Sequence, residues 1–329
     1  MIRSVALAVR SVCGIAVTLA GVLTAAPAVA QEFPTRSIRM VLPFPAGGGS
    51  DLVARIIAQK YSQLLGQQVI VDNRAGASGN IAADIVAKAP GDGYTVFFAN
   101  SSLSISPAIY KKLSFDPVKD FAAISMASSY PFVLVAHPAL PAKSVKDLVT
   151  LARGKPNSLD YSSAGTGTMS HMAMEMLRVK TGTRITHLPY KGAAPATVAL
   201  LTGESQVAFV VMPVAAPHIA SARLRGLGVA DKVRSAVAPN VPTMIEGGVP
   251  DLVALQWNGL FVPAKTPQAV QDKLYREWVA AVKSPEVMQR IRAEGAEPSG
   301  NTPAEFSAFY RAEAVKWADV AKQSGTTVD

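Results

Sequence analysis

Four short stretches rich in glycine, serine and threonine are the part of this sequence whose residue types and spacing indicate binding chemistry. The first loop is residues 45–51 (PAGGGSD), the second 75–80 (AGASGN), the third 100–102 (NSS) and the fourth 162–168 (SSAGTGT). Each separates a predicted strand from a predicted helix. Glycine lets backbone amides approach a ligand, and a helix start offers unpaired N–H groups with partial positive charge. With hydroxyl groups as further donors, these loops favour a small anion.

The alternative is that glycine and serine only make tight turns at these places. Four such loops at equivalent positions favour a binding site, because ligands of open parallel sheets bind beyond the carboxyl ends of the strands. A nucleotide site is disfavoured, since residues 47–49 lack the GxGxxG spacing and no Gly-Lys-Ser/Thr follows them. We expect Asp51 to be the N-cap of the following helix and to fix the first loop, rather than to bind a metal.

The sequence gives little support for a hydrolase active site or a metal site. There is no GxSxG motif, and Ser170 and His171 project about 100° apart on a helix, so they cannot meet. His171 and Glu175 share a helix face and could in principle bind a metal, but without an HExxH motif we interpret them as a helix-face pair. The other histidines are unclustered in the sequence: His137, His187 and His218.

Alternating strand and helix patterns position these loops and predict parallel βαβ units. The strands expected in a first block are residues 37–42, 68–71 and 94–99. Those of a second block are residues 131–136, 159–161, 183–187 and 206–211. We therefore expect an α/β fold of two lobes, each a mainly parallel sheet flanked by helices.

The C-terminal third predicts three helices. Each follows a hydroxyl residue and a proline, at residues 266–267, 284–285 and 302–303, which suit the N-cap and the first helical position. We expect these helices to pack back onto the first lobe, which would then consist of residues 31–127 plus 229–329. The second lobe would be residues 128–228, with chain crossings near residues 126–129 and 227–231.

The N-terminus predicts export to the periplasm. Arg3 and Arg10 accompany an apolar run at residues 12–23, and residues 28–30 (AVA) suit signal peptidase, so we expect a signal peptide at residues 1–30 that is cleaved before Gln31. A membrane anchor is the alternative, but the apolar run is short for a span. Cys13 lies inside the signal, so we expect no lipid anchor, disulfide or thiol chemistry in the mature chain.

The overall charge does not predict a nucleic-acid partner. The 329 residues carry a formal charge of +9, yet Lys and Arg are scattered singly, and the longest basic run is the pair at residues 111–112. Nucleic-acid binding would need such residues clustered on one face.

An ordered set of motifs along the chain resembles the tripartite tricarboxylate transporter receptors, also called Bordetella uptake (Bug) receptors. Each motif is weak alone, but the ordered set is specific. The motifs are residues 38–44 (IRMVLPF) with Gly47, Gly48 and Asp51, residues 71–74 (VDNR) with Gly76 and Gly79, residues 92–95 (DGYT), residues 163–167 (SAGTG), residues 187–192 (HLPYKG), residues 241–243 (VPT) with Glu246 and Gly247, and Trp257 with Gly259 and residues 266–267 (TP).

The resemblance implies a Venus-flytrap periplasmic binding protein, type II-like and not an enzyme, without cofactor or metal. It implies that backbone amides, hydroxyls and ordered waters hold a ligand carboxylate, and that membrane permease subunits are the partners of a monomer. The ligand-binding residues that it implies are Phe44, Ala46, Gly47, Gly48 and Ser50 with Ser101 in the first lobe, and Ser163, Gly165, Thr166 and Thr168 with Met212 in the second. Residues 74–75 (Arg-Ala) depart from the Arg-Pro often found in the family, so the second loop is not included.

Two alternatives remain open at this stage, a secreted α/β hydrolase and a ligand receptor for a sensor kinase. Neither the first nor the fourth loop contains Lys or Arg. We therefore expect helix N-termini and hydroxyls to recognise the anion, with Arg74 or Lys191 contributing at most from the rim.

Overall fold

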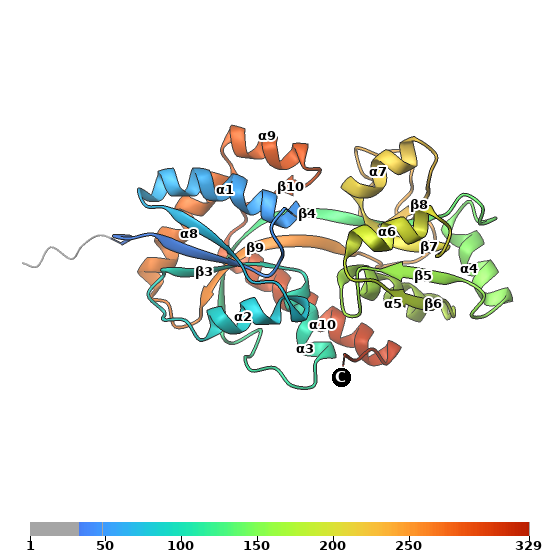
Figure 1. Cartoon of the computed structure of the whole chain (residues 1–329), viewed down its shortest axis with the longest axis horizontal. Coiled ribbons are helices and arrows are strands. Elements are labelled where there is room, and N and C mark those ends of the chain that lie inside the picture. The colour runs from blue at the N-terminus through green and yellow to red at the C-terminus, as the bar shows by residue number, and fades with distance from the viewer. Residues whose placement is uncertain (1–32, 48, 329) are drawn as a thin grey trace, which may run out of the picture. The chain divides into compact units, whose positions relative to one another are not determined.

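A computed structural model describes residues 33–47 and 49–328 (Figure 1). Residues 36–329 form one unit, separate from the segment before Arg36, and the expected signal peptide at residues 1–30 lies outside the described residues. The strands are β1 (Ile38–Leu42), β2 (Val69–Asn73), β3 (Thr95–Asn100), β4 (Phe121–Ala136), β5 (Asp160–Ser163), β6 (Thr186–Pro189), β7 (Val207–Val211), β8 (Arg225–Val229), β9 (Leu255–Pro263) and β10 (Glu297–Pro298). The helices are α1 (Gly49–Leu65), η1 (Ala77–Gly79), α2 (Asn80–Ala87), α3 (Ser102–Ile109), α4 (Val145–Gly154), α5 (Met169–Thr181), α6 (Ala193–Leu201), α7 (Met212–Ala220), α8 (Gln268–Val282), α9 (Pro285–Ala293) and α10 (Pro303–Ser324).

The strands pair in the order β2-β1-β3-β9-β4-β7-β5-β6, and β8 and β10 also pair with β4. β1 is parallel to β2 and β3, and β5 is parallel to β6 and β7. β9 and β4 are antiparallel to their neighbours and lie between these two parallel sets. The carboxyl ends of each parallel set therefore meet at one edge, which is where the first, third and fourth loops begin.

Strand β4 belongs to both lobes. Its first part pairs with β9, and its last five residues, from Phe132 to Ala136, pair with β7. Figure 1 shows β4 and β9 running between the two lobes. The outward crossing expected near residues 126–129 falls inside β4.

The segment between β8 and β9 is hydrogen-bonded to the last part of β4, which pairs with β7 of the second lobe. Ala230 N–H donates to the carbonyl of Phe132 (2.8 Å), and Ala254 N–H donates to that of Ala230 (2.9 Å). Gly247 packs so closely on Val145 of α4 that an added Cβ would lie 2.9 Å from it. We therefore propose that the chain returns to the first lobe at the start of β9, and that the second lobe extends about 25 residues beyond the expected boundary at residue 228.

Two of the three C-terminal helices begin where expected. Ser284 is the N-cap of α9, and Thr302 forms a capping box with Glu305 at the start of α10. α8 begins one residue later than predicted: Pro267 takes the N-cap position and Thr266 lies outside the helix, with a buried hydroxyl that has no partner among the described residues.

Helix α10 joins the apolar cores of the two lobes. Phe306 and Tyr310 pack in the first-lobe core around Trp257, whereas Trp317 and Val320 pack in the second-lobe core. α8 and α9 pack against α1 of the first lobe, whereas only the first half of α10 packs in the first-lobe core. Among residues 33–328, no helix is long and apolar enough to cross a membrane.

Candidate ligand-binding site

Asp51, in the first turn of α1, holds the first loop from behind. Its buried carboxylate accepts hydrogen bonds from Gly47 N–H (2.9 Å) and Asn73 Nδ2 (2.9 Å), and it pairs with Arg55 at 3.0 Å. Burial alone would raise the pKa of Asp51, but these partners outweigh it and hold that pKa below its ordinary value. Asp51 fixes the loop as expected, although from inside the helix rather than from the N-cap, because α1 begins at Gly49.

The residues expected to form the first-lobe side of the site differ in burial. Phe44 and Ser50 are half-buried, and Ala46 and Gly47 are exposed. Gly48 lies outside the described residues. The exposed backbone of this loop is therefore open to approach at Ala46 and Gly47.

Ser50 and Ser101 both contact strand β9. Ser50 Oγ donates to Asn258 Oδ1 (2.9 Å), and Ser101 Oγ donates to Gln256 Oε1 (3.1 Å). The hydroxyl of Tyr130, on β4, hydrogen-bonds with the side chains of Ser50 and Asn258, while burial raises its pKa. The structure thus joins two predicted residues to three polar side chains that the sequence analysis missed.

The second loop lies against the first. A Cβ added to Gly79 would lie 2.9 Å from Cβ of Pro43, and Gly79 has a φ of 97°, so this close approach requires glycine. Tyr110 OH, just after α3, donates to Ser78 Oγ at 3.3 Å. The second loop therefore supports the first loop from the side.

In the second lobe, the fourth loop lies beside the loop that follows β6. Tyr190 N–H donates to the carbonyl of Ser163, and Gly192 N–H donates to that of Ala164, each at 3.0 Å. The strands that precede them pair in parallel, with Ser163 opposite Pro189. The motif at residues 187–192 is therefore part of the same edge as the fourth loop.

Four of the five backbone amides of residues 164–168 donate hydrogen bonds inside the lobe. The pairs are Ala164 N–H with Ser170 Oγ (3.0 Å), Gly165 N–H with Ser163 Oγ (3.1 Å), Gly167 N–H with His171 Nδ1 (3.1 Å) and Thr168 N–H with the carbonyl of Gly165 (3.2 Å). Thr168 Oγ1 also donates to that carbonyl (2.7 Å). Among the described residues, Thr166 is the exception: neither its N–H nor its half-exposed hydroxyl has a partner.

Ser163 and His187 form a serine–histidine pair that their spacing in the sequence concealed. Ser163 Oγ lies 2.6 Å from Nε2 of His187, and Ser163 is only 1% exposed. A hydroxyl buried to this extent is closed to a substrate. The pair therefore holds the loop in place and does not offer a nucleophile.

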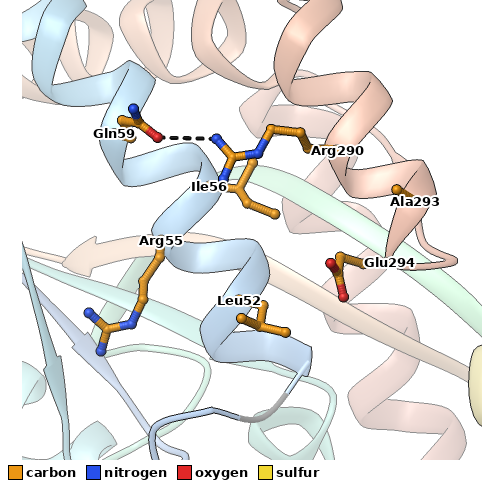
Figure 2. A pocket seen from close by; sticks show the side chains of 7 residues that line it. All are labelled: Leu52, Arg55, Ile56, Gln59, Arg290, Ala293 and Glu294. Carbon is orange, nitrogen blue, oxygen red and sulfur yellow. Dashed lines mark hydrogen bonds between the residues drawn. The ribbon is translucent and has the colours of Figure 1, made fainter.

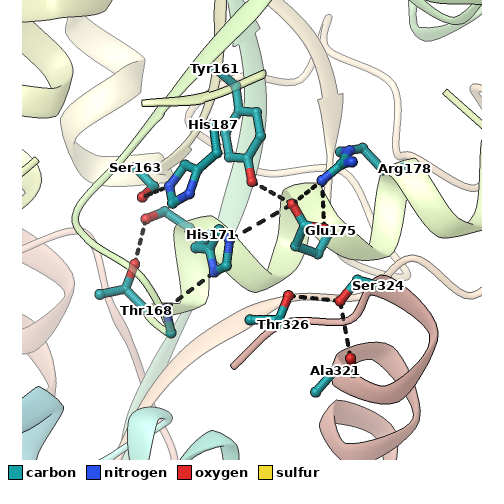
Figure 3. Close-up of polar contacts among 12 residues, drawn as sticks. Tyr161, Ser163, Thr168, His171, Glu175, Arg178, His187, Ala321, Ser324 and Thr326 are labelled. Atoms are coloured by element: carbon teal, nitrogen blue, oxygen red, sulfur yellow. Dashed lines mark hydrogen bonds and ion pairs between the residues drawn. The ribbon is translucent and has the colours of Figure 1, made fainter. Parts of the chain in front are cut away.

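A buried polar network lies beneath the fourth loop (Figure 3). Glu175 accepts from Tyr161 OH and twice from Arg178 (2.6 and 2.7 Å), and its Oε1 lies 3.7 Å from Nε2 of His171. The ring of His187 stacks on those of His171 (4.1 Å) and Tyr161 (4.7 Å). The expected helix-face pair of His171 and Glu175 is thus part of a larger cluster, which includes a histidine that is distant in the sequence.

Burial keeps both histidines of this network neutral. Burial and then the nearby Arg178 lower the pKa of His171 to about 4. Burial, His171 and Arg178 lower the pKa of His187 to about 4, against the opposing effect of Glu175. Within residues 33–328, no group of three or more His, Cys, Asp or Glu side chains could hold a metal ion.

Met212, the last of the predicted residues, is the first residue of α7 and is buried. It packs with Val133, Val135 and Leu200 in an apolar cluster of the second lobe. The sequence alone could not show whether Met212 is buried in the core or lines a ligand pocket, because an apolar residue after a strand is common in both places.

A cavity of about 280 Å³ lies between α1 and α9 (Figure 2). The residues that line it are Leu52, Arg55, Ile56, Gln59, Arg290, Ala293 and Glu294. None of the predicted binding residues is among them. Arg290 donates to Gln59 Oε1 across it (3.1 Å), so the two helices are held together at this point.

The chain is similar to known proteins over nearly its whole length. Residues 53–326 match the family model described as "Tripartite tricarboxylate transporter family receptor". Protein BugT of Bordetella pertussis is 35% identical over 317 residues, which cover 96% of this chain and 97% of that protein.

Solved structures agree with this match. The structure of an R. palustris protein with adipate superimposes with a TM-score of 0.79 and 34% identity, covering 90% of this chain and 99% of that one. The structure of MatC from Rhodopseudomonas palustris with bound malate gives a TM-score of 0.77 and 29% identity, covering 88% and 99%. These neighbours confirm the two-lobed α/β fold that the sequence predicts.

Proposed function

Because the chain belongs to the tripartite tricarboxylate transporter receptor family, whose members are solute-binding receptors and not enzymes, we propose that it captures a small carboxylate-bearing anion between its lobes. It then delivers that anion to integral membrane permease subunits of a tripartite tricarboxylate-type transporter. The family is one of periplasmic binding proteins, which supports a periplasmic location.

The state of Thr166 is the observation that carries this proposal. Every other amide of residues 164–168 is used inside the lobe, so the N–H and hydroxyl of Thr166 are the donors left for a ligand. Opposite them, the first-lobe contribution comes from the exposed backbone at Ala46 and from Ser50, whereas Gly47 N–H is bonded to Asp51 and supports the loop. Gly165 shapes this surface, and the buried Ser101, Ser163 and Met212 act from behind it together with Thr168. Gly48 stays an expected ligand contact.

No cation occupies either loop. Arg74 is paired with Asp72 at 3.0 Å, and Lys191 is exposed. Hydrogen-bond donors and helix N-termini therefore stabilise the negative charge of the carboxylate. Their interaction with that charge is stronger in a closed site than in water.

The ligand class is a short aliphatic dicarboxylate. The chemistry of two facing donor loops suits a small anion, and the relatives of known structure hold adipate and malate. A thermal-shift screen of mono- and dicarboxylates, acidic amino acids and aromatic acids tests this. A ligand at about a hundredfold excess over its Kd should add about 2.7 kcal/mol of stability. A screen in which no carboxylate raises the melting temperature would reject the proposal.

Thr166→Ala should weaken binding of the best dicarboxylate by about 1–3 kcal/mol, because a charged acceptor loses a donor in a closed site. Lys191→Ala is the matched control and should change the affinity less, because this lysine is exposed at the rim. Isothermal titration calorimetry compares the two variants with the native chain. If Lys191→Ala abolishes binding while Thr166→Ala binds normally, recognition depends on the cation instead.

A further inference from the structure

Two buried histidines on different elements hold the fourth loop at two points. Gly167 N–H donates to Nδ1 of His171 on α5, and Ser163 Oγ contacts Nε2 of His187 on β6. Gly167 also packs closely against α3, since an added Cβ would lie 2.2 Å from Cδ1 of Ile109, and the φ of 77° at Gly167 favours glycine. The loop is therefore fixed from both ends around Thr166.

The direction of the hydrogen bond from Gly167 defines the proton of His171. A backbone amide can only donate, so Nδ1 must carry its lone pair, and the proton of a neutral ring is then on Nε2. Nε2 faces Oε1 of Glu175 at 3.7 Å, which is where a donor belongs. A protonated ring would instead turn an N–H toward the N–H of Gly167 and break this contact.

We propose that His171 and His187 are positioning residues for ligand binding, which as neutral rings hold Gly167 and Ser163 so that Thr166 faces the anion. This rests on the proposed function, because it explains how one loop residue is left free to bind. The hydrogen bond from Gly167 N–H to His171 is the central contact of this proposal. The ring of His187 stacks on that of His171 at 4.1 Å and so fixes the orientation of both rings.

Burial and the positive charge of Arg178 keep these rings neutral, whereas the carboxylate of Glu175 favours a proton on His187. Glu175 and Arg178 come from α5 itself, and Tyr161 comes from β5. α10, which packs on α5, brings the hydroxyls of Ser324 and Thr326 (Figure 3). As pH falls toward about 4, where His171 takes up a proton, the acceptor for Gly167 is lost, so ligand affinity is full above this pH and falls below it.

Two substitutions separate the acceptor from the ring. His171→Phe keeps a stacking ring without an acceptor, whereas His171→Asn places an amide oxygen near the position of Nδ1 without the ring. His218→Asn, at a histidine on α7, is the matched control. The ligand-free readouts are hydrogen exchange at the Gly167 amide and the ¹⁵N spectrum of the imidazoles. The ligand readout is calorimetry with adipate and with malate at pH 7.5 and at a pH near 4.

We expect an unprotonated Nδ1 and a protonated Nε2 at His171 in the native protein. In His171→Phe, the Gly167 amide should exchange faster and the ligand should bind about tenfold more weakly, the effect of one lost hydrogen bond. His171→Asn should retain most of both properties and should lose less affinity than the native protein between pH 7.5 and a pH near 4, where His171 takes up its proton. The affinity that His171→Asn still loses at the lower pH comes from protonation of the ligand's own carboxyl groups.

A protected Gly167 amide in His171→Phe, or equal loosening in both His171 variants, would overturn the proposal. A protonated Nδ1 in the native spectrum would do the same. If the native protein binds neither adipate nor malate, the ligand class proposed above fails, while the ligand-free measurements still decide whether the histidines hold the loop.

Discussion

Glu175→Leu should lower the free energy of unfolding by about 3 kcal/mol, near the lower end of the range for breaking a buried ion pair. Glu175 is 3% exposed and accepts hydrogen bonds from Tyr161 OH and from Arg178. Its loss would leave the buried Tyr161 hydroxyl and the Arg178 guanidinium without their acceptor. Because the side chain of Arg178 is 31% exposed, it can turn partly to water, which limits the loss.

Urea unfolding followed by circular dichroism measures this effect. The double variant Glu175→Leu, Arg178→Met is the control, because it removes both charges and should recover much of the lost stability. A single variant as stable as the native protein would mean that the network contributes nothing. A double variant no more stable than the single one would mean that the stranded charge is not the cause.

Local patterns in the sequence were enough to predict the parallel strands of each lobe and the loops that follow them, but not β8 or β9. The predicted strand at residues 37–42 corresponds to β1, and the expected N-caps Ser284 and Thr302 lie at the starts of α9 and α10. These features depend on a few adjacent residues, so periodicity and capping chemistry report them directly.

The features that the sequence analysis missed depend on residues brought together from distant parts of the chain. His187 meets His171 because Tyr161 pairs with His187 in the parallel register of β5 and β6, and α5 packs on those strands. Asn258 lies in β9, a strand that was not predicted, where it pairs with Asn100. The sequence signal that could have found Asn258 and its partner Ser50 is an asparagine within an apolar run. The structure buries this asparagine fully, and a buried amide needs hydrogen-bond partners.

The point where the chain returns from the second lobe to the first was also hard to predict from local sequence. Residues after β8 contain short polar turns that resemble a lobe boundary, yet the backbone hydrogen bonds of Ala230 and Ala254 support the proposal that these residues belong to the second lobe. Such bonds are set by the edge that β4 offers, which no local pattern in residues 230–254 reveals.

Trp317→Ala should cost about 3–5 kcal/mol of the free energy of unfolding, the usual range for removing a large buried aromatic side chain. Trp317 is fully buried in the second-lobe core, and its Nε1–H donates to Glu313 Oε2 at 2.9 Å. Trp317→Phe keeps most of the packing but leaves Glu313 with one donor fewer, so it should cost less. Guanidinium unfolding of both variants, followed by far-ultraviolet circular dichroism, gives the two values.

The same substitution tests whether the lobes unfold together. α10 places Phe306 in the first-lobe core and Trp317 in the second, so a defect at either end weakens an element on which both cores depend. We therefore expect one cooperative transition in the native protein, in Trp317→Ala and in Phe306→Leu, each variant with a lower midpoint. Two separate transitions in Trp317→Ala, the first-lobe transition keeping its native midpoint, would show that α10 does not couple the lobes. Coupling through α10 would restrict ligand-driven closure to a rotation of the lobes about β4, β9 and this helix, because separating the lobes would expose Trp317.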